Sequence, residues 1–137
     1  MISTDETKAV LELLQAQSAL TVVTSTRIWA DVDQPPSSYK PADGIGICFK
    51  VRGGTDGDPR VLVHPSFQFK VYGTKPNESP ELTVRNAARL LHDNLDEKTS
   101  KDILTVYREV MPVTLREPDA EWIYALVFYK VMIRNLN

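Results

Sequence analysis

The sequence predicts a single α+β domain over residues 1–137, with an antiparallel or mixed β-sheet of about four to five strands packed against two α-helices. Three observations support this prediction. Two stretches have apolar residues at helical spacing, and several others alternate apolar and polar residues with the period of two that is typical of strands. The last two apolar segments, Ile103–Arg116 and Trp122–Arg134, are joined by the short polar turn 117–120. They predict a long C-terminal β-hairpin.

The two predicted helices begin at capping sequences. Ser3 and Glu6 have the spacing of a capping box, and apolar residues follow at helical spacing, which predicts a helix from Thr4 to about Gln17. The run Ser79-Pro80-Glu81 places a capping side chain, a helix-starting proline and a carboxylate in order, which predicts a second helix that ends near residues 94–98. The apolar stripe of this second helix consists of Val84, Ala87, Ala88, Leu91 and Leu95.

Strands are predicted between these two helices. Thr21–Ala30 is rich in β-branched residues, which predicts one or two short strands. Ile45–Val51 alternates apolar and polar residues, and a second alternating run begins at Arg60, so we expect an antiparallel hairpin with its turn at Gly53–Pro59. Pro65 lies within the second run. Because proline cannot donate a ladder hydrogen bond, we expect it at a sheet edge or at a bulge.

The final segment, Trp122–Arg134, has apolar side chains on both of its faces. Antiparallel sheets usually turn one polar face to water. The segment would extend about 43 Å, whereas a domain of this size is about 37 Å across, so we expect the strand to curve, to contain a bulge or to project. With two helices to cover one face, the other face should meet a neighbouring subunit. The side chains assigned to this interface are Trp122, Tyr124, Phe128 and Met132.

Residues 31–44 predict a long irregular loop, because three prolines and two serines interrupt any regular pattern. Loops of this length in a compact domain are usually functional or disordered. We therefore consider two interpretations, a segment that contacts a partner and an idle surface loop. The residues assigned to the partner contact are Pro35, Pro36, Ser37, Ser38, Tyr39 and Lys40.

The composition limits the classes of function. Hydrophobic residues make up 42% of the chain and charged residues 25%, which is typical of a soluble domain. The net charge of −2 offers no basic surface for phosphate groups, so we expect no sequence-specific contact with nucleic acid. No apolar run approaches the roughly 18 residues of a membrane span, and the acidic start MISTDETK is unlike a signal peptide. We therefore expect a soluble protein without a membrane partner.

The residues that could support catalysis lack the required partners. His64 begins a His-Pro-Ser sequence similar to the paired His-x-Ser motifs of some phosphoesterases, but the second copy is absent. His92 falls on the polar side of the second predicted helix. We therefore favour a strand-end histidine and a surface histidine over a catalytic pair. Cys48 is the only cysteine, which excludes a disulfide within the chain, and we expect it to be a small buried hydrophobe.

Metal and phosphate sites are also not predicted. The glycine-rich stretch 53–58 lacks the Lys and Ser or Thr of a P-loop and the ligand series of a calcium hand, so a plain hairpin turn is favoured. The two histidines and the cysteine do not have the close spacing of a zinc site. Four aspartates lie in or beside turns, where Asp is common for backbone reasons; they are Asp31, Asp33, Asp43 and Asp58. We expect no catalytic residue, no metal and no cofactor.

The order of the elements nevertheless resembles a known family. Arg27-Ile28-Trp29 precedes a proline-rich loop, and the strand Phe67–Tyr72 leads into an alanine-bearing helix and a closing hairpin. Over nearly the whole chain this order is similar to the tail-terminator or tail-completion proteins of long-tailed bacteriophages. The resemblance implies a non-catalytic virion subunit, assembled in the host cytoplasm, six copies of which form a ring at the neck. Such a ring caps the tail tube, stops its growth and docks on the connector or head-completion protein.

Two other functions remain open on the residues alone. The first is a small dimeric α+β adaptor or ligand-binding domain without catalysis, for which a deep apolar pocket would be expected. The second is a minor enzyme that uses His64.

Overall fold

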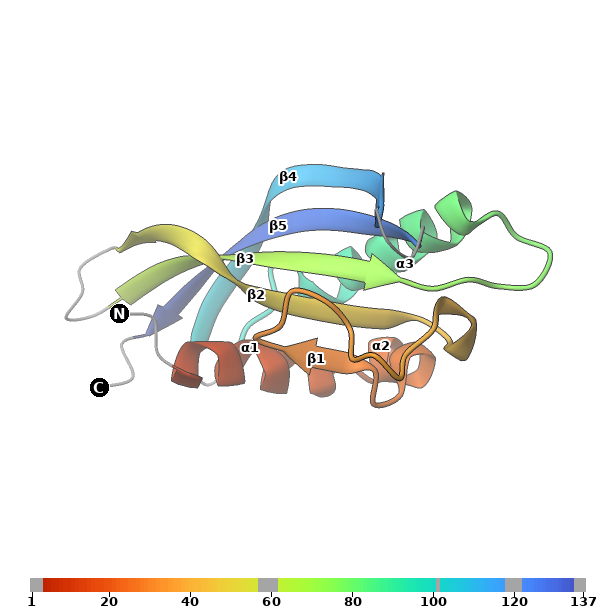
Figure 1. Ribbon diagram of the computed structural model, residues 1–137. Helices are drawn as coiled ribbons and strands as arrows, with labels where there is room; N and C mark the ends of the chain where they lie inside the picture. Colours follow the sequence, from red (N-terminus) through yellow and green to blue (C-terminus); the bar gives the residue numbers. More distant parts are fainter. Residues whose placement is uncertain (1–3, 57–61, 101, 118–121, 135–137) are drawn as a thin grey trace.

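The computed structural model describes residues 4–56, 62–100, 102–117 and 122–134. These residues form the predicted α+β fold, in which a five-stranded mixed sheet has the order β1-β2-β3-β5-β4 (Figure 1). The helices are α1 (Thr4–Gln15), α2 (Ser18–Thr24) and α3 (Pro80–Leu95). The strands are β1 (Ile28–Ala30), β2 (Gly46–Asp56), β3 (Leu62–Tyr72), β4 (Ile103–Arg116) and β5 (Ile123–Arg134).

Helix α3 forms as its capping sequence predicts. The Ser79 side-chain oxygen accepts a hydrogen bond of 3.2 Å from the backbone N–H of Leu82, and Pro80 occupies the first turn. All five residues of the predicted apolar stripe are buried. Because this stripe faces the sheet, the helix covers the region where β3, β5 and β4 lie side by side (Figure 1).

Residues 18–24 form a helix, so the strand predicted at Thr21–Ala30 is wrong in its first half. Leu20 and Thr24 are fully buried in α2. The intrinsic preference of β-branched residues for strands spans only about 1 kcal/mol, and burial of an apolar side chain such as Leu20 can outweigh it. The Arg27 guanidinium also donates hydrogen bonds of 3.0 Å to the carbonyl oxygens of Val23 and Ile45, which ties the end of α2 to the sheet. The second half of the prediction is confirmed as β1.

Strands β2 and β3 form the predicted antiparallel hairpin, with Phe49 opposite Phe69. The turn does not begin at Gly53, because residues 53–56 continue β2 and pair with residues 63–66 after a bulge between Val51 and Gly53. Gly53 has a φ of +120°, a conformation that glycine adopts more readily than other residues and that suits a bulge. The remainder of the predicted turn, residues 57–59, lies outside the described residues.

The position of Pro65 follows from this bulge. It lies in β3, which has a strand on either side, so the edge alternative is wrong. Pro65 is opposite Gly54, immediately beyond the bulge. Val63 and Ser66 pair with Ile133 and Lys130 of β5, whereas the two residues between them do not pair with β5. The missing donor of Pro65 therefore falls where pairing with β5 is interrupted.

The predicted C-terminal hairpin is confirmed, and its first strand, β4, lies at the edge of the sheet. Strand β5 pairs with β3 on one side and β4 on the other. The β4–β5 register shifts between Ile103 and Thr105, between Arg108 and Val110, and between Val110 and Val113. The irregularity expected for the long final strand is therefore accommodated by its partner, β4, which contains Pro112.

The hydrophobic core lies between the three described α-helices and one face of the sheet. On β5 this face consists of Ala125, Val127, Tyr129, Val131 and Ile133, which are all buried. The opposite parity of β5, which begins at Tyr124, is only partly buried. We refer to this second side of the sheet as the helix-free face. None of the described helices is long and apolar enough to cross a membrane.

Candidate functional site

The loop at residues 31–44 folds back over the helix-free face beside β2 (Figure 1). Tyr39 anchors one part of the loop because its ring is 3% exposed and its hydroxyl donates a 2.7 Å hydrogen bond to the Gly44 carbonyl oxygen. The residues between Asp33 and Tyr39 remain exposed except for Pro35, which is half-buried. The loop is therefore held at two points with a polar segment between them.

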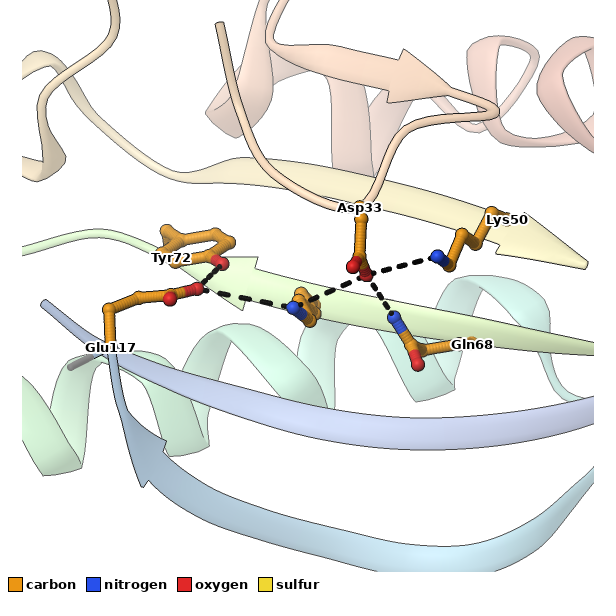
Figure 2. A network of polar contacts seen from close by, with 6 residues as sticks. Asp33, Lys50, Gln68, Tyr72 and Glu117 are labelled. Carbon is orange, nitrogen blue, oxygen red and sulfur yellow. Dashed lines mark hydrogen bonds and ion pairs between the residues drawn. The ribbon is translucent and has the colours of Figure 1, made fainter. Parts of the chain in front are cut away.

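Asp33 provides the second anchor, and Figure 2 shows it pointing at the middle of the sheet. Its Oδ1 lies 3.4 Å from the ammonium nitrogens of both Lys50 and Lys70. The same oxygen accepts a 3.1 Å hydrogen bond from the side-chain amide of Gln68. Burial opposes ionisation of this carboxyl, but the Gln68 hydrogen bond and the two ammonium groups outweigh it and lower the pKa of Asp33. An ionised carboxylate thus fastens the loop to β2 and β3.

The network continues from Lys70 to the end of β4. Glu117 follows β4 and is buried, with its Oε1 4.0 Å from the Lys70 ammonium and 2.6 Å from the Tyr72 hydroxyl, which donates to it (Figure 2). Burial, followed by this hydrogen bond, raises the pKa of Tyr72 far above its usual value. The hydroxyl therefore stays protonated and keeps its role as donor.

An aromatic cluster surrounds this end of the network. Trp29, Tyr39, Tyr72, Trp122 and Tyr124 pack around Cys48, mostly edge to face, while the Tyr72 and Tyr124 rings are stacked 5.2 Å apart. Burial raises the pKa of Cys48 to about 12, so its thiol is neutral at physiological pH. Cys48 is a buried core residue, as the sequence predicts.

All four side chains assigned to a subunit interface lie on the helix-free face. Trp122, Tyr124, Phe128 and Met132 are each partly exposed. The rings of Trp122 and Tyr124 already pack within the aromatic cluster, whereas Phe128 and Met132 lie farther along β5. No helix covers this side of β5 in the described part of the chain. Their contact with a neighbouring subunit remains a prediction.

The predicted partner-contact loop divides into two parts. Pro36, Ser37, Ser38 and Lys40 are exposed, and Pro35 is half-buried. Tyr39 is different because it belongs to the aromatic cluster. Its contribution is therefore internal, and only the other five residues are available to a partner in this conformation.

The exposed apolar side chains of β4 were not predicted from the sequence. Val110, Met111 and Val113 expose 51%, 66% and 48% of their surface. Pairing places Val110 beside Phe128 and Val113 beside Leu126 on the helix-free face. Pro112 was the signal that could have revealed them, because a proline within a strand is typical of a sheet edge.

The two histidines are separated and lie in different surroundings. His64 is in β3, and its Nε2 is enclosed without a hydrogen-bond partner among the described residues. The prediction that His92 lies at the surface is wrong. His92 belongs to α3 and is half-buried, with its ring facing Tyr129 of β5. Its Nδ1 lies 2.8 Å from the Tyr129 hydroxyl, and its Nε2 lies 3.7 Å from the Asp96 carboxylate. This arrangement attaches α3 to the sheet and does not bring the two histidines together.

Within the described ranges, the remaining aspartates and the surface hollows do not form an additional polar site. Asp43 accepts a 3.0 Å hydrogen bond from the Lys40 backbone at the short 3-10 helix Pro41–Asp43, whereas Asp58 lies outside the described residues. No group of three or more His, Cys, Asp or Glu residues within the described ranges could hold a metal ion. A hollow of about 330 Å³ beside Pro41, Pro80 and Trp122 is near the lower limit for ligand pockets, roughly 300–1,000 Å³.

The fold and this face define a small α+β protein with one helix-covered and one helix-free side of its sheet. No protein-family model matches the sequence, and no curated protein matches it. Among solved structures, the chain is similar to one described as "Virion of native gene transfer agent (GTA) particle". The TM-score is 0.61, the sequence identity is 14%, and the match covers 91% of each chain. At this identity the likeness shows a shared fold.

Proposed function

We propose that this chain is a non-catalytic structural subunit of a phage-like virion, and more specifically a tail-terminator or tail-completion protein. Six copies would form a ring that caps the tail tube and joins it to the connector or head-completion protein. The fold supports this proposal because it is shared, over 91% of both chains, with a chain described as part of a virion particle. The order of the elements along the sequence also supports the proposal through its resemblance to the tail-terminator family.

The helix-free face is the main structural support for assembly. The helices bury one side of β5 completely, but Phe128 and Met132 on the other side remain partly exposed. A subunit that enclosed both sides of β5 by itself would have no such apolar surface to offer to a neighbour. An apolar side of a sheet that remains open is typical of a surface that meets another subunit.

The test is removal of this chain from a genome that also encodes the capsid and tail-tube proteins. Electron microscopy should then show tail tubes of uncontrolled length without attached heads, and expression from a plasmid should restore normal particles. Particles with normal tails and heads in the absence of the chain would contradict the proposal. A purified chain that is strictly dimeric and dispensable for tails would favour the adaptor alternative.

The His64→Ala variant tests the alternative of an enzyme that uses His64. Expressed from the plasmid, this variant should restore assembly as well as the unaltered chain does.

The partner-contact loop needs a separate variant. Deletion of residues 37–40 would also remove the buried Tyr39, so it would damage the aromatic cluster. Replacement of the exposed Ser37 and Ser38 by glutamate changes only the surface. Loss of head attachment in a ring that still forms would support the contact, whereas normal particles would identify the loop as an idle surface.

A further inference from the structure

We infer that an apolar surface shared by β4 and β5 binds a second copy of this chain. We call it the β4–β5 patch and define it by six side chains: Val110, Val113 and Leu115 of β4, and Tyr124, Leu126 and Phe128 of β5. The inference deepens the proposed function, because it names the surface through which subunits of the ring would meet. It moves the centre of the contact from β5, where the sequence placed it, to the edge of the sheet.

The strand register builds the patch in three adjacent rows. Leu115 pairs with Tyr124, Val113 with Leu126 and Val110 with Phe128. Directly paired residues of antiparallel strands point to the same side of a sheet. All three rows therefore lie on the helix-free face, even though the register shifts between Val110 and Val113.

Strand β4 forms an open edge of the sheet, but its backbone does not favour non-specific pairing with other strands. No strand pairs with its outer side in the part of the chain that the structure describes. An open edge with exposed apolar side chains is a risk for aggregation, and proteins limit that risk with bulges and prolines. Strand β4 has both, in its three register shifts and Pro112. A partner should therefore dock on the side chains of the patch rather than extend the sheet without regard to sequence.

Polar groups enclose the patch on two sides. At one end Glu109 accepts a 2.5 Å hydrogen bond from the Ser66 hydroxyl and lies 3.9 Å from the Lys130 ammonium. On the β3 side, Lys70 lies 4.0 Å from Glu117. The six members themselves have no charged group. An apolar centre with a paired polar rim is the usual composition of a specific interface, and a contact there would bury no unpaired charge.

Area and charge indicate a second copy as the occupant. Val110, Val113 and Leu115 expose 51%, 48% and 38% of their surface, and Met111 in the adjoining bulge exposes 66%. With the partly exposed members on β5, the apolar area is on the order of 500 Å², which approaches the ~800 Å² that each partner contributes to a standard interface. A net charge of −2 causes little repulsion between copies.

A pair of matched substitutions tests the inference. Val113→Glu places a charge in the patch, and Val22→Glu places the same charge on α2, where Val22 is 81% exposed. Sedimentation over a concentration series should show self-association of the unaltered chain and of Val22→Glu, but about tenfold or greater weakening for Val113→Glu. Circular dichroism confirms that each variant is folded. Equal association of both variants, or an unaltered chain that is monomeric at every soluble concentration, would overturn the inference.

A thiol probe identifies what covers the patch. Cys48 is the only cysteine and is 1% exposed, so Val113→Cys introduces an accessible thiol at a known place, with Val22→Cys as its control. The thiol at position 113 should become protected from modification as the protein concentration rises, whereas that at position 22 should not. Protection that requires added tail-tube protein would identify a different occupant and refute the inference.

These results separate the inference from the proposed function. Self-association that Val113→Glu abolishes, in a chain that tails do not need, would support the β4–β5 patch and remove the virion role. Suppose instead that Val113→Glu leaves self-association unchanged and the variant still produces normal tails. This result would support the virion role and remove the β4–β5 patch.

Discussion

Replacement of Tyr72 by phenylalanine removes the hydroxyl that donates a 2.6 Å hydrogen bond to the Glu117 carboxylate. Tyr72 is 0% exposed and Glu117 is 9% exposed, so water cannot readily replace the lost donor. A hydrogen bond to a charged group contributes about 1.5–3 kcal/mol. Lys70 remains 4.0 Å from the carboxylate and limits the loss. We therefore expect Tyr72→Phe to lower the free energy of unfolding by about 2 kcal/mol.

Thermal unfolding followed by circular dichroism measures this loss. With an unfolding entropy of about 2.1 cal/mol/K per residue, a chain of 137 residues should show a fall in Tm of about 7 °C. Tyr124→Phe is the matched control, because its ring stacks on Tyr72, whereas the hydrogen bond to Glu117 comes from the Tyr72 hydroxyl. It should change stability by about 0.5 kcal/mol or less. Equal Tm values for the two variants would refute the reasoning.

A double-mutant cycle locates the lost energy. In a Glu117→Gln background the acceptor is neutral, so Tyr72→Phe should cost about half as much as in the unaltered chain. An unchanged cost would mean that the Tyr72 hydroxyl acts through some other group. The result matters for assembly because Glu117 fixes the end of β4 against β3, next to the β4–β5 patch.

Three further predictions concern the loop, the core and the thiol. Because the pKa of Asp33 is lowered, its contribution to stability is complete above about pH 4 and is lost as the pH falls through the lowered pKa. An NMR titration should show that the Asp33 carboxyl titrates with a midpoint below about 3.9 and that signals of the loop at residues 31–44 share this midpoint. A midpoint at or above that value would contradict the prediction. Leu91→Ala, at a fully buried site of α3, should cost about 2–5 kcal/mol in urea unfolding, whereas Leu82→Ala, at a site 41% exposed on the same helix, should cost about 0.5 kcal/mol. Cys48, with a pKa of about 12, should react with thiol reagents only after denaturation, and rapid modification of the native chain at neutral pH would show that it is accessible.

The parts of the fold that could be predicted are those whose signals are local. The start of α3 depends on Ser79 and Pro80, which act on the first turn of their own helix, and both hairpins join strands that are adjacent in the sequence. Helix α2 could not be predicted in this way. It is seven residues long, too short for a periodic pattern, and the burial of Leu20 in the core determines its conformation.

The candidate site is less predictable because distant segments form it. The position of Asp33 beside a turn predicts no role beyond the backbone, yet Asp33 meets Lys50 and Lys70 because the loop folds back over the sheet. The apolar side chains on both faces of β5 could be predicted, because they can be read from the sequence of that one strand. Its partner surface on β4 depends on which strand takes the edge position, and the order β3-β5-β4 is set by packing across the whole sheet.

The order of the strands also has a consequence for synthesis on the ribosome. Strand β5 follows the other described strands in the sequence, but in the sheet it lies between β3 and β4. Its Tyr129 pairs with Phe67 of β3, which is about sixty residues earlier in the sequence. Until β5 emerges from the exit tunnel, only β1, β2 and β3 can pair, while β4 has no partner strand and β3 lacks one of its neighbours. Formation of the complete sheet must therefore wait for β5, and until then the unpaired edge of β3 is exposed to aggregation.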